Sequence, residues 1–183
     1  MKLYSCLLFQ LLFICSTQAQ KISHTEKRNS QLTHVKGNDF EGVIFSKDFA
    51  FPFHKNESGD KRFTPTNEEI ENAESILSKD ISTINALQPN QGGDKGPVIH
   101  KNLKNYIRQY YGYFNHCGDK IIFISCLLKG NYKVAPSVTP NWLKGAVLVL
   151  NGGSNYWQVQ ANISRSKLFE LDVNGIDRSS SLR

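Results

Sequence analysis

The stretch TNEEIENAESILSKDISTINAL, residues 66–87, decides the fold that the sequence predicts. Thr66 and Glu69 have the spacing of a capping box, and the acidic residues just after Thr66 favour the start of a helix. Apolar residues then recur at helical spacing and form one stripe: Ile70, Ala73, Ile76, Leu77, Ile81, Ile84 and Leu87. The stretch therefore predicts a helix that packs one side against another layer.

The sequence also indicates where this helix ends and which of its faces is exposed. Pro89 and the pair Gly92-Gly93 stop the helical pattern. The face opposite the stripe is polar and includes Glu74 and Lys79, so we expect it in solvent.

Strands are expected both before and after the helix in the sequence. Residues 40–53 are rich in aromatic and β-branched residues and predict a strand that ends near Pro52. Downstream, further strands are predicted at residues 104–114, 120–128, 145–150, 154–163 and 167–173. A helix followed by antiparallel strands can bury its stripe only by lying across one face of their sheet. We expect an α+β fold, with one amphipathic helix on an antiparallel sheet of four to six strands, arranged as in cystatin-like folds.

Two patterns predict which side chains share a face of the sheet. A hairpin through residues 115–119 that places Phe114 opposite Ile121 would put Tyr111 on the same face as Ile122. Further along, the alternation is clean. The residues expected inward are Trp157, Val159, Ala161 and Ile163, and those expected outward are Tyr156, Gln158, Gln160 and Asn162.

The first nineteen residues predict export. Lys2 precedes an apolar run that ends at Cys15 and is too short to span a bilayer, and small residues stand where a signal peptidase would cut after Ala19. A lipid anchor at Cys15 is disfavoured because the bulky Ile14 precedes it. We therefore expect a signal peptide at 1–19 and a secreted or periplasmic protein with no transmembrane segment after cleavage.

The remaining chain is expected to form one domain. Residues 20–38 are polar and aperiodic and predict a flexible leader. The α+β domain is expected at 39–175, followed by a frayed tail at 176–183, and we expect a monomer.

The composition argues against several classes of function. The net charge of +6 is spread along the chain and interleaved with acidic residues, whereas a nucleic-acid site needs clustered cations. Cys117 and Cys126 are expected to stay unpaired, as a turn residue and a core thiol. The five histidines lack the spacing of a zinc motif, so no metal site and no cofactor are predicted.

One pattern resembles a known group. It consists of YIRQYYGY at 106–113, KIIFI at 120–124, Trp142, LNGGSNYW at 150–157, and Phe169 with Asn174-Gly175. Over roughly residues 65–175 it resembles a group of small exported proteins of Bacteroidota-type bacteria. The resemblance implies export and a helix-plus-sheet fold, and it brings no activity, substrate or catalytic residue.

The function expected from these features is binding without catalysis. Exported binding modules often present aromatic side chains to sugars or protein partners. The candidate partner-binding residues are Trp142, Tyr156, Gln158, Gln160, Tyr110 and Arg108, and the partner is an unidentified protein or glycan.

Two alternatives stay open. One is an envelope enzyme or enzyme accessory whose site the sequence does not reveal. The other is a cystatin-like protease inhibitor, for which the nearest string is Gln158-Val159-Gln160-Ala161-Asn162. That string lacks the Val at its third position and the Gly at its fifth that the Gln-x-Val-x-Gly hairpin of those inhibitors carries.

Overall fold

The computed structural model describes residues 20–50, 61–85, 90–130, 141–149 and 151–175. The expected signal peptide at 1–19 and the expected tail at 176–183 lie outside these residues. Within them, no helix is long and apolar enough to cross a membrane.

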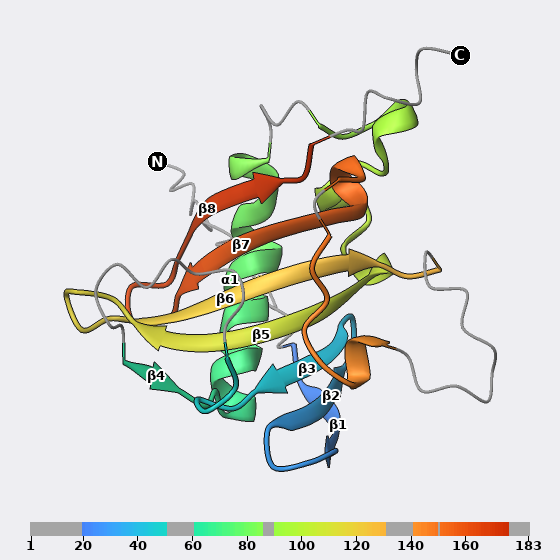
Figure 1. Ribbon diagram of the computed structural model, residues 1–183. Helices are drawn as coiled ribbons and strands as arrows, with labels where there is room; N and C mark the ends of the chain where they lie inside the picture. The colour runs from blue at the N-terminus through green and yellow to red at the C-terminus, as the bar shows by residue number, and fades with distance from the viewer. Residues whose placement is uncertain (1–19, 51–60, 86–89, 131–140, 150, 176–183) are drawn as a thin grey trace, which may run out of the picture.

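The described residues form one α-helix, five short 3₁₀ helices and one sheet (Figure 1). The strands are β1 (Ile22–Lys27), β2 (Leu32–Gly37), β3 (Glu41–Phe45), β4 (Arg62–Phe63), β5 (Tyr106–Phe114), β6 (Lys120–Leu128), β7 (Tyr156–Asn162) and β8 (Lys167–Val173). Their order is β1-β2-β3-β5-β6-β7-β8, with β4 paired to β5 beyond the end of β3. All pairs are antiparallel except β3–β5, which is parallel. The α+β class is confirmed, and the expected count of four to six strands is too low.

Two strands that the sequence did not predict, β1 and β2, come from the segment expected to be a flexible leader. Residues 22–37 form the hairpin of β1 and β2, and Leu32 and Val35 are buried. The backbone N–H of Ile22 donates to Oε1 of Glu71 at 2.7 Å, which ties β1 to the helix. The expectation of a flexible leader at 20–38 is therefore wrong, because β1 and β2 pair with each other and β2 contributes Leu32 and Val35 to the core.

The helix α1 (Asn67–Ile84) begins as predicted. Oγ1 of Thr66 accepts from the backbone N–H of Glu69, and the Glu69 carboxylate accepts from the N–H of Thr66, so the capping box is confirmed. The helix ends at Ile84 with Asn85 as its C-cap, and the predicted end near Leu87 falls outside the described residues. Glu74 was expected in solvent, but it is buried.

The sheet has a core on each face, and the β5–β6 register differs by one residue from the expected one. Phe114 lies opposite Lys120, and Tyr113 lies opposite Ile121. The Asn115 side chain sets this register, since its Oδ1 accepts from two N–H groups of the turn, those of Cys117 and Asp119. A shift of one residue moves every side chain of a strand to the other face relative to its partner. Tyr111 therefore shares its face with Phe123, not with Ile122.

The core on the helix face joins α1 to inward residues of the sheet, including Tyr106, Tyr110, Ile122, Ile124, Trp157 and Val159. The inward assignments of Trp157, Val159 and Ala161 are confirmed. A second core lies on the opposite face and includes Phe45, Tyr111, Phe123, Leu127 and Trp142.

Residues 141–149, here called the crossing segment, cover that second core. The segment starts with the short 3₁₀ helix η4 (Asn141–Leu143) and runs across the sheet on the face away from α1 (Figure 1, orange). Gln109 of β5 holds it, because its Nε2 donates to the carbonyl of Gly145 and its Oε1 accepts from the N–H of Val147. The strand expected at 145–150 is therefore wrong for its described residues, since a side chain binds this backbone where a strand partner would.

Candidate functional site

A groove lies between the crossing segment and the edge of the sheet formed by β7 and β8. Its volume is about 280 Å³. The side chains with functional promise on its walls are Leu148, Tyr156, Gln158, Asp172 and Asn174. Because Tyr156 and Gln158 are two positions apart on β7, they point to the same face, and the crossing segment forms the opposite wall.

The polar groups of the groove are partly held in place. Nε2 of Gln158 donates to Oδ2 of Asp172 at 2.9 Å, across the β7–β8 pair. Leu148 is 56% exposed, and Tyr156 and Gln158 are half-buried. The groove thus offers a ring, an amide and a carboxylate beside an exposed apolar side chain.

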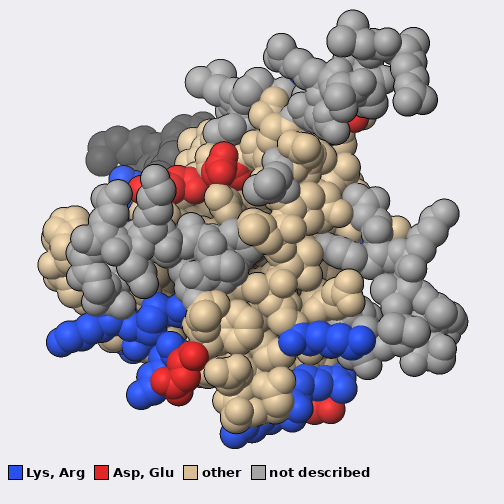
Figure 2. Space-filling view, viewed as in Figure 1, with Lys and Arg blue, Asp and Glu red and all other residues tan. Residues whose placement is uncertain are grey.

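The surface around the groove is weakly charged. Figure 2 shows that, among the described residues, Lys and Arg gather along the lower margin of this face and acidic side chains gather over β8. The middle of the face, over the crossing segment and β7, is largely uncharged (Figure 2). A ligand in the groove therefore has acidic side chains on the β8 side, Asp172 among them, and a largely uncharged surface on the other side.

The groove brings together two of the six sequence candidates, Tyr156 and Gln158. Gln160 lies on the same face of β7 but is buried, where it accepts from the Tyr113 hydroxyl and donates to the Glu170 carboxylate. It is therefore part of the packed interior, although the alternation predicted it on the outward face.

Arg108 and Tyr110 lie on the other face of the sheet, under α1. Nε of Arg108 lies 3.3 Å from Oε1 of Glu74, and the Tyr110 hydroxyl donates to the same oxygen at 2.9 Å. Burial has the largest single effect on the pKa of the Arg108 guanidinium and lowers it. The charge and hydrogen bond of Glu74, together with Cys126 and Tyr110, outweigh burial and leave the pKa raised. Burial, reinforced by the charge of Glu74, raises the pKa of Tyr110 well above its ordinary value. These groups link the helix to the sheet and offer no exposed atom to a partner.

Trp142 was the other aromatic residue expected at the surface, but it is buried. It lies in η4 and packs edge-on against the ring of His34, with the ring centres 5.6 Å apart. The expectation failed because the loop before Trp142 suggested exposure, whereas Trp142 is part of the second core.

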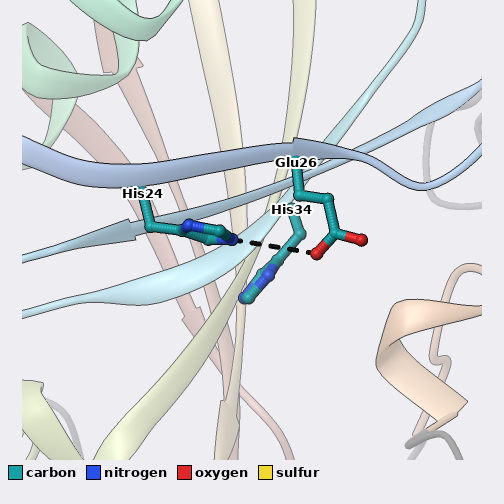
Figure 3. A group of neighbouring side chains, drawn as sticks. All are labelled: His24, Glu26 and His34. Atoms are coloured by element: carbon teal, nitrogen blue, oxygen red, sulfur yellow. Dashed lines mark ion pairs between the residues drawn. The ribbon is translucent and has the colours of Figure 1, made fainter.

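Sequence reasoning missed a cluster of three side chains at the β1 edge of the sheet (Figure 3). His24, Glu26 and His34 each offer one ligand atom within 4.8 Å of the others. His24 and Glu26 alternate on β1, and His34 lies directly opposite Glu26 on β2. The histidine–x–glutamate alternation was the available signal, and the assignment of residues 20–38 to a flexible leader concealed it.

The two cysteines of the described chain are both free, as predicted. Cys117 is exposed in the β5–β6 turn, and Cys126 is buried on the helix face. Burial raises the pKa of the Cys126 thiol, and the nearby Arg108 offsets this only in part. Within the described ranges, no base is seen to hydrogen-bond to either thiol.

The chain matches no protein-family model, and comparisons with curated proteins and with solved structures find no similar protein. The likeness to exported Bacteroidota proteins and to cystatin-like folds therefore stays a prediction. The functional argument rests on the chemistry of the residues themselves.

Proposed function

We propose that the chain is an exported, non-catalytic binding module whose ligand occupies the groove between the crossing segment and β7–β8. The observation that carries the proposal is the meeting of Tyr156, Gln158 and Asp172 in one concave site of about 280 Å³. Ligand sites typically combine apolar or aromatic walls with a few convergent polar groups, and this groove has both. Export is part of the proposal and rests on the first nineteen residues.

The groove favours a polyhydroxylated ligand of the glycan class. A tyrosine ring gives a flat surface on which a sugar ring can stack, and the amide and carboxylate of Gln158 and Asp172 suit hydroxyl groups as donor and acceptor. The hydrogen bond between them positions both groups before a ligand arrives. The acidic side chains over β8 disfavour an anionic ligand, and the largely uncharged middle of the face suits a neutral one.

A protein partner is the second candidate, and Leu148 favours it. Among the described residues, Leu148 is the one large hydrophobic side chain recorded as exposed. Single exposed apolar residues are common on monomers, so this observation carries less weight than the polar constellation of the groove.

The test is ligand binding by the purified protein with cellotriose, chitotriose, maltotriose and laminaritriose as probes. We expect at least one probe to raise the melting temperature in a concentration-dependent way. Tyr156→Ala and Gln158→Ala should each abolish that rise. Gln31→Ala is the matched control, since it removes an exposed amide in the β1–β2 turn, away from the groove.

Two outcomes would overturn the proposal. A rise that survives both groove substitutions would place the ligand elsewhere, and no rise with any probe would remove the glycan class. Loss of capture of a protein partner by Leu148→Ser, with no glycan effect, would establish the second candidate instead.

A further inference from the structure

We propose that His24, Glu26 and His34 form a binding site for a first-row divalent transition-metal ion such as Zn²⁺, and the argument starts from His34. Only 8% of His34 is exposed. Its Nε2 lies 3.2 Å from Oε1 of Glu41, whereas its Nδ1 is buried without a hydrogen-bond partner among the described residues. A buried polar atom without a partner costs free energy unless something binds it.

The Glu41 contact determines what that atom offers. A carboxylate can only accept a hydrogen bond, so Nε2 carries the proton in the neutral ring. Nδ1 is then the unprotonated nitrogen. It has a lone pair, and no group among the described residues donates a hydrogen bond to it. A metal-ligating histidine commonly donates its other N–H to a carboxylate, which fixes the tautomer and the orientation of the ring. His34 and Glu41 have this arrangement.

The other two groups complete a mixed set of nitrogen and oxygen ligands. His24 and Glu26 project from β1 on the same side as His34 (Figure 3), and their closest atoms, Nε2 and Oε2, lie 3.8 Å apart. Two imidazoles and one carboxylate suit zinc and its neighbours, whereas calcium and magnesium prefer oxygen ligands throughout. Three protein ligands leave a fourth tetrahedral position for water.

The geometry needs only a small adjustment. Bonds of about 2.0–2.2 Å to zinc place the ligand atoms of a tetrahedron about 3.3 Å apart, and one ligand atom from each of the three side chains already lies within 4.8 Å of the other two. The side chains of His24 and Glu26 are 53% and 45% exposed, so they have room to adjust towards an ion. His34 is held by Glu41 on one side and by the ring of Trp142 on the other.

Two cations compete with a metal ion at this site. Nη2 of Arg28 lies 2.9 Å from Oε2 of Glu26, and Lys36 lies opposite His24 in the β1–β2 pair. A metal ion has to share Glu26 with Arg28 or displace it. Removal of Arg28 should therefore strengthen metal binding, whereas removal of a ligand should weaken it.

The cluster is separate from the groove. It lies at the β1 edge of the sheet and the groove lies at the β7–β8 edge, so this inference does not rest on the proposed function.

The experiment is calorimetric titration of the purified, metal-free protein with Zn²⁺, followed by the absorption spectrum with Co²⁺. We expect one ion per chain. His24→Ala and Glu26→Gln should each weaken binding by at least about tenfold, and Arg28→Ala should strengthen it. The Co²⁺ protein should show the visible bands of a tetrahedral site. His116→Ala is the matched control, because it removes an exposed imidazole in the β5–β6 turn and should leave the affinity unchanged.

His24 decides between a coordination site and a simple electrostatic attraction. Weak attraction of a cation to Glu26 would respond to Glu26→Gln and Arg28→Ala but not to His24→Ala, and that result would overturn the proposal. Binding that disappears in Cys117→Ser, or no binding to the wild-type protein, would overturn it as well. His24 and Glu26 are exposed, so the variants at these positions should keep the melting temperature of the wild type. An unchanged melting temperature would exclude unfolding as the cause of lost metal binding.

Trp142 gives a second readout, which reports that the ion binds near His34. Its ring is in contact with that of His34, so Co²⁺ bound at His34 should quench its fluorescence. Trp142→Phe should remove the quenched component and leave the emission of Trp157. Unchanged emission on saturation with Co²⁺ would show that the ion does not bind at His34.

Discussion

Arg108 and Glu74 join the sheet to the helix through a buried ion pair, with Nε of Arg108 3.3 Å from Oε1 of Glu74. Arg108 also donates through Nη1 to the carbonyls of Leu103 and Tyr106, so its charge is surrounded by acceptors. Both side chains are at least 95% buried, which makes each dependent on the other. Taking two charges out of water is costly, and removing one partner leaves the other uncompensated.

Glu74→Gln is expected to destabilise the protein by about 3–5 kcal/mol, because it leaves the guanidinium of Arg108 buried without a counter-charge. Urea unfolding followed by circular dichroism measures the change. Glu68→Gln removes the same charge from the exposed first turn of α1, and it should cost less than about 1 kcal/mol. The double variant Glu74→Leu with Arg108→Met should be more stable than Glu74→Gln. Equal stability of Glu74→Gln and Glu68→Gln would show that the pair contributes nothing.

Cys117 and Cys126 are expected to differ strongly in reactivity. The thiolate is the reactive form, and burial both raises the pKa of Cys126 and blocks access to it. In the folded protein at mildly alkaline pH, iodoacetamide should label Cys117 and spare Cys126. Peptide mass spectrometry reads the two sites separately, and labelling in urea should reach both. Rapid labelling of Cys126 without denaturant would contradict its burial.

Gly42 is expected to tolerate no side chain. A Cβ at this position would lie 2.2 Å from the backbone carbonyl oxygen of Arg108, because β3 runs parallel to β5 there. Gly42→Ala should therefore destabilise the protein by about 1–3 kcal/mol or more, through displacement of one strand from the other. Gly145→Ala is the control, since a Cβ there would meet no atom within 4 Å. Thermal unfolding of the two variants compares them, and similar melting temperatures would contradict the close approach of β3 to β5.

The helix was predictable because its signals are local. The capping box at Thr66 and Glu69 and the apolar stripe that begins at Ile70 depend only on residues within a few turns of one another. The strands of the β5–β6 and β7–β8 hairpins were recognisable for a similar reason, since alternation and turn residues mark them.

The remaining features depend on contacts between segments that are distant in the sequence. The parallel pairing of β3 with β5 brings together residues more than sixty positions apart, and nothing local to either strand encodes it. Glu74 reads as a solvent residue until Arg108 is placed beside it. The binding of residues 145–147 by Gln109 is likewise invisible in the sequence.

The candidate sites, too, were predictable where the signal is local and were missed where they depend on distant segments. Tyr156 and Gln158 were predictable because the alternation of β7 places both on its outward face. Asp172 and Leu148, which complete the groove, come from β8 and from the crossing segment, whose path the sequence does not show. The His24–Glu26–His34 cluster needs the β1–β2 register, which a polar segment with few apolar residues does not reveal.

Thr66→Ala is expected to destabilise the protein by about 1 kcal/mol. The substitution removes the oxygen that accepts from the N–H of Glu69 and leaves one donor of the first turn unsatisfied. Thr66→Ser keeps that oxygen and should retain most of the stability. Chemical denaturation measures both variants, and an equal loss for serine and alanine would show that the methyl group of Thr66 matters, not its hydroxyl.

Asp119 should stabilise the protein only above acidic pH. Hydrogen bonds from Asn162, and further ones from Asn115 and Arg165, hold the pKa of its carboxyl below the ordinary value of 3.8. A carboxyl whose pKa is lower in the folded state contributes stability that is complete above its unfolded pKa and disappears as the pH falls through the folded value. Asp119→Asn should therefore be less stable than the wild type at neutral pH, and the difference should shrink below pH 3.8. Asp48→Asn, on an exposed turn, is the matched charge control. Melting temperatures measured from neutral pH down to about pH 2 follow the difference, and a gap that stays constant over that range would show that the ionised carboxylate of Asp119 is not what stabilises the turn.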